Sequence, residues 1–205
     1  VDAGLKAQSV DSGLPFIYQL ADDSNLYVIS AETMTCREVF YLGHDPGSVS
    51  VRPFVISGFM LVPVNAANYC NLHVLKPFEN GLKLDDAQTS IRFKGQVKSP
   101  IIRYNRWAIV MSDTGDLQMI EINKADEELP AETVVSQAVA VKRVGSNYLL
   151  ADSQQLWICG GYGIRRFRIQ NAVGKFSEKG VTNNLDAFLG PLSLNGETLF
   201  HLRRR

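Results

Sequence analysis

The sequence predicts an all-β fold made of repeated units of short strands, and two observations carry this prediction. The anchors of a recurring short apolar segment are 46, 45 and 47 residues apart, at Leu26, Leu72, Leu117 and Ile164. Residues that favour tight turns lie just before each anchor, at positions 21–24, 65–68, 112–115 and 160–163. A turn that returns four times at the same phase supports the repeat more strongly than any single strand does.

A period of about 46 residues filled with short strands is typical of a β-propeller of four-stranded antiparallel blades. Two glycine-led segments, 47–53 and 95–100, each precede a new apolar strand and mark the crossing between blades. We therefore expect one propeller domain over residues 1–205, with about four to four and a half blades. Because about six to eight blades are usual, we expect the chain to be part of a larger propeller. The expected blade-like units lie near 1–46, 47–94, 95–138 and 139–186, with a partial unit at 187–205.

The individual strands follow from short runs rich in Val, Ile, Leu and aromatic residues between turn residues. The polar segment 124–130 is expected to be a solvated loop between strands, and Asp85–Asp86 is expected to lie in a loop. The predicted strands are 13–20, 26–30 and 37–42; 59–64, 72–75 and 90–93; 100–104, 107–112, 117–122 and 133–135; and 148–151, 156–159 and 164–169.

Composition excludes some kinds of partner. Lys and Arg together number 21, Asp and Glu also number 21, and the formal net charge is zero. This balance argues against nucleic acid or an anionic membrane as a partner held by bulk charge. No apolar run has the length of a membrane-spanning helix. The three cysteines, Cys36, Cys70 and Cys159, form no CxxC pair, and we expect them to be buried, reduced thiols in strands.

The segment Asn25–Thr33 resembles the repeat of quinoprotein-like propellers of the pyrroloquinoline quinone (PQQ) type. That repeat has Gly or Asn, then Leu-Tyr, two apolar positions, Asp-Ala, a spacer and Thr-Gly. In this chain Ser30 stands where the pattern has Asp, Met34 stands where it has Gly, and the Trp that usually ends the repeat is absent. The resemblance implies a propeller fold and an extracytoplasmic location, and the family includes both dehydrogenases and non-catalytic scaffolds.

A quinoprotein enzyme would need a calcium site of converging acidic oxygens and a tryptophan beneath the cofactor. Asp22–Asp23 is the one turn in which adjacent acids lie in a strand context, while Trp107 and Trp157 lie inside strands and are expected in the core. The three histidines, His44, His73 and His201, have no metal-binding spacing. We therefore predict no catalytic residue, no cofactor and no metal site, and the glycine-rich segment 160–163 is expected to be a hairpin turn.

The candidate binding residues are Arg165, Arg166 and Arg168, the densest positive group in the body of the chain. On a strand, Arg166 and Arg168 share one face, whereas Arg165 points to the other. One interpretation is a groove for an acidic peptide or an anion. The other is a solvated edge strand, on which arginine discourages the addition of a further strand.

The function favoured by the sequence is a non-enzymatic propeller module for protein–protein or ligand binding and scaffolding, with its surface at the loop ends around the central channel. One alternative is a quinoprotein-like enzyme or cofactor-binding domain whose catalytic elements lie outside this segment. Another is a sensor domain of a larger protein. We expect a protein partner, or self-association through exposed blade edges.

Overall fold

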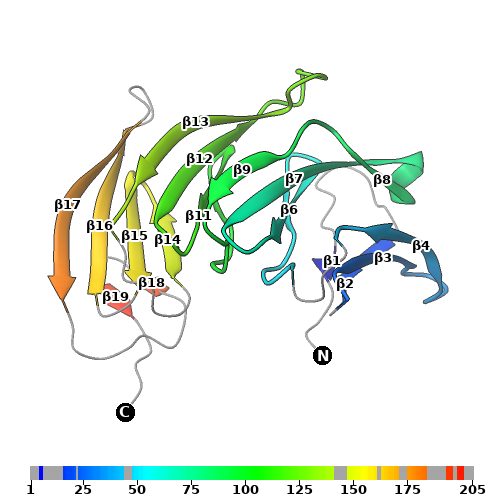
Figure 1. Cartoon of the computed structure of the whole chain (residues 1–205), viewed down its shortest axis with the longest axis horizontal. Coiled ribbons are helices and arrows are strands. Elements are labelled where there is room, and N and C mark those ends of the chain that lie inside the picture. The colour runs from blue at the N-terminus through cyan, green and yellow to red at the C-terminus, as the bar shows by residue number, and fades with distance from the viewer. Residues whose placement is uncertain are drawn as a thin grey trace, which may run out of the picture. The chain divides into compact units, whose positions relative to one another are not determined.

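The structure is a computed structural model that describes residues 5–6, 16–21, 23–43, 48–140, 147–160, 163–170, 175–183, 193–195 and 198–200. The described residues form strands joined by turns, with one short 3₁₀ helix, η1 (Glu79–Gly81) (Figure 1). Every strand pair whose register is described is antiparallel, and three of the sheets have four strands each. The predicted all-β fold with repeated four-stranded antiparallel sheets is therefore confirmed, whereas its closure into a propeller stays a prediction.

No helix among these residues is long and apolar enough to cross a membrane. By its internal contacts the chain divides into two units, Val1–Phe93 with Ile122–Glu132 and Lys94–Glu121 with Thr133–Arg205.

The first unit contains two sheets whose strands follow chain order. The first sheet has the order β1-β2-β3-β4, and the second has β5-β6-β7-β8 with β9 paired to β7. The strands are β1 (Leu5–Lys6), β2 (Phe16–Leu20), β3 (Asn25–Ser30), β4 (Cys36–Tyr41), β5 (Phe54–Ile56), β6 (Phe59–Asn65), β7 (Tyr69–Phe78), β8 (Lys83–Asp86) and β9 (Ile91–Lys94).

The core of the first unit is shared between its two sheets. In β3, buried and half-buried residues alternate, so Leu26 and Val28 share the inward face. They form one hydrophobic cluster with Tyr18 of β2 and with residues of the second sheet that include Met60 and Leu75. The β3 face that carries the repeat anchor therefore packs on the sheet that follows it in the chain.

The second unit repeats this arrangement. Its sheets have the orders β10-β11-β12-β13 and β14-β15-β16-β17, and β18 pairs with β19. The strands are β10 (Ile102–Tyr104), β11 (Trp107–Met111), β12 (Asp116–Ile122), β13 (Ala131–Ala138), β14 (Tyr148–Asp152), β15 (Gln155–Gly160), β16 (Gly163–Gln170), β17 (Lys175–Asn183), β18 (Ser193–Asn195) and β19 (Thr198–Phe200).

One apolar core joins the two four-stranded sheets of this unit. Leu117 and Met119 of β12 form one cluster with Leu156 of β15 and with Phe167 and Ile169 of β16. The anchor face of β12 thus packs on the following sheet, as the anchor face of β3 does in the first unit. Phe167 and Ile169 come from the other face of β16, so the anchor face of β16 takes no part in this core.

The repeat is also visible in the geometry of the turns. In the first sheet, the amide of Ala21 donates to the carbonyl of Asn25 (3.0 Å), and Ser24 donates to Ala21 (3.1 Å). The same two bonds, at 3.0 and 3.1 Å, join Ser112 to Asp116 and Gly115 to Ser112. Ser24 and Gly115, at the same place in the two turns, both have positive φ (64° and 85°).

Three expectations about individual segments are corrected by the structure. Asp85 and Asp86 end strand β8 and do not lie in a loop. The long strand β17, which has no counterpart among the predicted strands, pairs with β16 along its length. Consequently, β16 is an interior strand of its sheet and not an edge strand.

Candidate functional site

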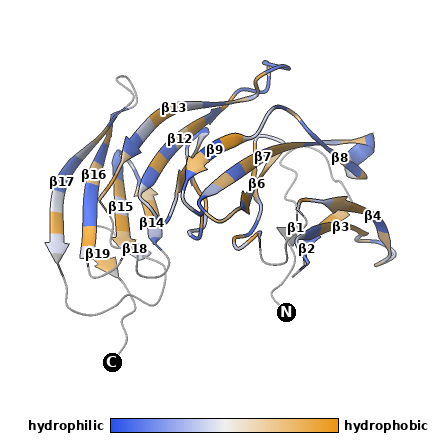
Figure 2. Ribbon diagram, in the orientation of Figure 1, coloured by the Kyte–Doolittle hydropathy of each residue, from blue (hydrophilic) through white to orange (hydrophobic). Residues whose placement is uncertain are grey.

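The predicted arginine group lies in the middle of the β14–β17 sheet. Across the ladder, Arg166 is paired with Trp157 of β15 and Gly180 of β17, and Arg168 is paired with Gln155 and Ser177. Both arginine side chains are exposed, while Phe167 between them is 1% exposed in the core. The sequence therefore placed Arg166 and Arg168 on one face correctly. Figure 2 shows this hydrophilic part of β16 beside the largely hydrophobic β15.

A hollow of about 360 Å³ lies on this face. Its lining contains three cationic side chains, two amides and no carboxylate among the described residues. The residues are Gln154, Gln155, Arg166, Phe167, Arg168 and Lys179. We call Arg166, Arg168 and Lys179 together the cationic face.

The hollow is partly organised by its own hydrogen bonds. Arg168 donates from Nη2 to Oε1 of Gln154 (3.4 Å), a neutral acceptor that brings no negative charge to the guanidinium. The backbone carbonyl of Gln154 accepts a bond of 2.8 Å from the amide of Ile169. The turn between β14 and β15 is thereby attached to β16, and it places the Gln154 amide group beside the guanidinium of Arg168.

Arg165 is separated from the other two arginines. Its Nε lies 3.9 Å from Oε1 of Glu178, and its side chain does not line the hollow. The cationic residue that sequence reasoning missed is Lys179. The segment Lys175–Asn183 lacks the alternation of apolar and polar residues that would predict a strand. Among its residues with described burial, only Phe176 is buried.

The interpretation of the arginines as residues of a solvated edge strand is wrong about the edge and right about the solvent exposure of Arg166 and Arg168. The edge strands of this sheet are β14 and β17 (Figure 1), so Arg166 and Arg168 on β16 do not protect an edge. They are nevertheless exposed, on a face that in the first and third sheets of the chain is covered by the next sheet.

Among the histidines and acids considered for metal or acid–base chemistry, His73, Asp86 and Asp23 have local partners. Nδ1 of His73 lies 3.0 Å from Oδ1 of Asp86 on the neighbouring strand β8, and both side chains are partly exposed. The Asp23 carboxylate accepts bonds from the Asn25 amide and the Tyr27 hydroxyl, both 3.1 Å. Hydrogen bonding from Asn25 lowers the pKa of Asp23. His44, His201, Asp22 and the pair Gly161–Tyr162 lie outside the described residues.

The tryptophans and cysteines differ partly from expectation. Trp107 and Trp157 are half-buried, and Trp107 stacks on Tyr104 with ring centroids 5.9 Å apart. Cys70 and Cys159 are fully buried, as predicted, and Cys159 is a free thiol, whereas Cys36 is exposed on the edge strand β4. Burial raises the pKa of Cys159 to about 12.

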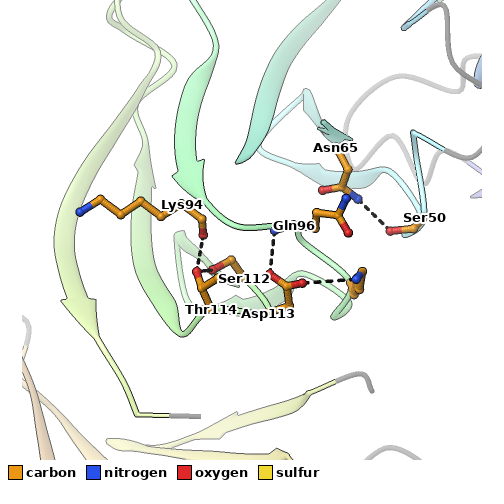
Figure 3. A network of polar contacts seen from close by, with 8 residues as sticks. Ser50, Asn65, Lys94, Gln96, Ser112, Asp113 and Thr114 are labelled. Carbon is orange, nitrogen blue, oxygen red and sulfur yellow. Dashed lines mark hydrogen bonds and ion pairs between the residues drawn. The ribbon is translucent and has the colours of Figure 1, made fainter. Parts of the chain in front are cut away.

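A second polar network is structural. The crossing segment that follows β9, residues 95–100, is attached to the turn between β11 and β12 (Figure 3). The backbone N–H of Gln96 donates to Oδ1 of Asp113, and the hydroxyl of Thr114 donates to the backbone carbonyl of Lys94 at the end of β9. Ser112 and Thr114 hydroxyls are 3.0 Å apart within the same turn. These bonds either close the turn or attach it to the segment after β9, and we assign them to holding consecutive parts of the sheet structure together.

Within the described part of the chain, no three His, Cys, Asp or Glu side chains are placed to share a metal ion. No protein-family model and no curated protein matches the chain. Fold and site together describe an all-β protein of antiparallel sheets with a cationic hollow on the exposed face of one sheet.

Proposed function

We propose that this chain is a non-enzymatic module of β-propeller type that binds a protein partner or ligand through the cationic face. The propeller part rests on the sequence period, on the identical turns at Ser24 and Gly115, and on the packing of consecutive sheets in each unit. The resemblance of Asn25–Thr33 to the quinoprotein-like repeat gains support from Met34. Its φ of 53° is a conformation that glycine, the residue of the family pattern, adopts without strain.

Ser30, at the position of the aspartate in that pattern, closes the turn that follows β3 with its side chain and its carbonyl. Its hydroxyl accepts a bond from the amide of Thr33 (3.3 Å), and its carbonyl accepts one from Met34 (2.8 Å). Aspartate and serine side chains both close turns in this way. The alternative of a quinoprotein-like cofactor domain keeps this resemblance in its favour, but no observation among the described residues adds a cofactor site.

The binding proposal is carried by one observation, the gathering of three cationic side chains in the lining of the hollow. Three exposed cations share one hollow that none of the described acids lines. In a chain of zero net charge, such a local excess attracts a complementary anionic surface at short range and is screened by salt. Arginine is suited to this role because its planar guanidinium binds carboxylates in a bidentate manner.

Binding of fluorescent poly-glutamate to the whole chain, followed by anisotropy at low and at physiological salt, tests the proposal. We expect measurable binding that weakens with salt, and a loss of about four- to twenty-fivefold in the double variant Arg166→Ala/Arg168→Ala, the product of two exposed ion pairs. The matched control is Arg165→Ala, which removes the same charge from the other face of the same strand. Equal binding by the double variant and the control would refute the assignment of the cationic face.

A further inference from the structure

The composition of the cationic face depends on a β-bulge. Along the β16–β17 ladder, Arg166 is paired with Gly180, but Phe167 is paired with Glu178, so Lys179 is an extra residue on β17. In a regular antiparallel register, Lys179 would lie across from Phe167 and Glu178 across from Arg168. A bulge inserts one residue and shifts the face to which its neighbours point.

The shift has a direct effect on charge. Glu178 now shares the face of Phe167 and Arg165, where its carboxylate lies 3.9 Å from Arg165. The neutral Ser177 is the residue across from Arg168, and Lys179 lines the hollow with both arginines. One inserted residue thus removes a carboxylate from beside Arg168 and adds an ammonium group to the hollow.

The same bulge occurs one hundred and thirty-eight residues earlier, where Val28 is paired with Glu38 and Ile29 with Cys36. Arg37 is the extra residue there. Val28, the counterpart of Arg166, is 0% exposed and lies in the core between the first two sheets. The backbone feature therefore belongs to the repeat, but on β16 the face that it shapes carries cations where β3 carries aliphatic side chains.

The geometry points to an extended ligand. Arg166 and Arg168 are alternate residues of one strand, so their backbones are about 6.5–7 Å apart, and Lys179 lies on the adjacent strand about 5 Å to the side. Carboxylates two residues apart in an extended peptide have the same spacing of about 6.5–7 Å. The side-chain amides of Gln154 and Gln155, at one side of the hollow, provide donors for the carbonyl groups of such a segment.

We propose that the cationic face binds an extended acidic segment of a partner protein with carboxylates at alternate positions, acid-x-acid, and that the Lys179 bulge makes this face selective for it. The inference rests on the proposed binding function and specifies its partner. The segment lies over the face and does not add to the outer edge of β17, because a strand that carries a bulge is twisted and pairs poorly with a further strand. Each arginine forms one ion pair with one carboxylate.

The test compares two labelled peptides of equal charge and composition, one with alternating Glu and Thr and one with all Glu followed by all Thr. Binding to the whole chain is measured by anisotropy at low salt, with inorganic phosphate as a competitor. We expect the alternating peptide to bind at least about fivefold more tightly, and phosphate to compete only weakly. Arg166→Ala, Arg168→Ala and Lys179→Ala should each weaken its binding about two- to fivefold, the range of one exposed ion pair.

Arg165→Ala is the matched control and should leave the affinity for the alternating peptide unchanged, and thermal unfolding of each variant shows whether it is folded. Equal affinity for the two peptides, or competition by phosphate as strong as that by the peptide, would overturn the alternating-acid inference while leaving anion binding intact. Absence of binding to both peptides and to poly-glutamate would overturn the proposed function itself. Binding lost equally in Arg165→Ala would show general charge attraction and also overturn the inference.

Discussion

Gln96 and Asp113 hold each other by two reciprocal hydrogen bonds. The backbone N–H of Asp113 donates to the backbone carbonyl of Gln96 (2.8 Å), and the backbone N–H of Gln96 donates to Oδ1 of Asp113 (2.9 Å). The first of these bonds recurs forty-eight residues earlier, where Asn65 donates to the carbonyl of Ser48 (2.7 Å). The crossing segment before a sheet is therefore fixed to the turn within that sheet, and the repeat is maintained by backbone bonds as well as by packing.

Replacing Asp113 with alanine should destabilise the fold by about 1–3 kcal/mol, because the amide of Gln96 loses a charged acceptor. The Lys98 ammonium lies 3.3 Å from Oδ2 of Asp113, but this ion pair adds little to the free energy of unfolding because it is partly exposed to solvent. Lys98→Ala should therefore cost at most about 0.5 kcal/mol. Urea unfolding measures both; similar losses in the two variants would contradict the dominant role of the Gln96 bond.

Gly95→Ala should destabilise the protein by about 2 kcal/mol or more, for two reasons. Gly95 has a φ of 79°, and an added Cβ would lie 2.5 Å from Oδ1 of Asp113 and 2.6 Å from Cγ2 of Thr114. The control is Gly180→Ala, whose added Cβ meets nothing within 4 Å. Thermal unfolding should show a large loss for the first variant and a small change for the second.

Met34→Gly should stabilise the chain by about 0.5–1 kcal/mol. Met34 has a φ of 53°, and its side chain is 69% exposed, so glycine relieves backbone strain with little loss of packing. Met34→Ala retains the strain and should change stability by less than about 0.5 kcal/mol. A lower unfolding midpoint for Met34→Gly than for Met34→Ala would contradict this explanation of the turn.

The three thiols should react in two classes. Iodoacetamide at pH 8 should modify the exposed Cys36 in the folded protein, while the fully buried Cys70 and Cys159 should react only after unfolding. Mass spectrometry of the intact and digested protein distinguishes the sites. Rapid labelling of Cys159 without denaturant would contradict its burial between the strands.

Cys159 should also make stability depend on pH above the neutral range. Its pKa is raised by burial from 9.0 to about 12, so the folded state holds its proton where the unfolded state releases it. The corresponding stability is complete below about pH 9 and decreases as the pH rises towards 12, by up to about 1.4 kcal/mol per pH unit. Cys159→Ala removes this contribution, and its unfolding free energy should decrease less steeply between pH 8.5 and 10.5. Parallel pH profiles for the two proteins would contradict the shift.

Much of the fold could be predicted from sequence because its signals are local. Strands such as Asn25–Ser30 and Trp107–Met111 follow from runs of apolar residues, and the turns before Leu26 and Leu117 follow from residues that close turns with their own backbone. The shared face of Arg166 and Arg168 also follows from the two-residue period of a strand. The sequence alone thus determined the all-β class, the recurring strands and turns, and two of the three residues of the cationic face.

The tertiary structure decided which strands pair and where the pairing slips. The polar strand β17 forms because its backbone pairs with β16. This pairing makes β16 an interior strand and places Lys179 in the lining of the hollow, and no local pattern in the sequence predicts either result. Exposure was likewise decided by packing: Val28 and Arg166 occupy the same repeat position, but the next sheet covers only Val28. Strand pairing joins segments distant in sequence, and a one-residue shift changes the face of the neighbouring side chains, so the charge of this site depends on register and not on composition.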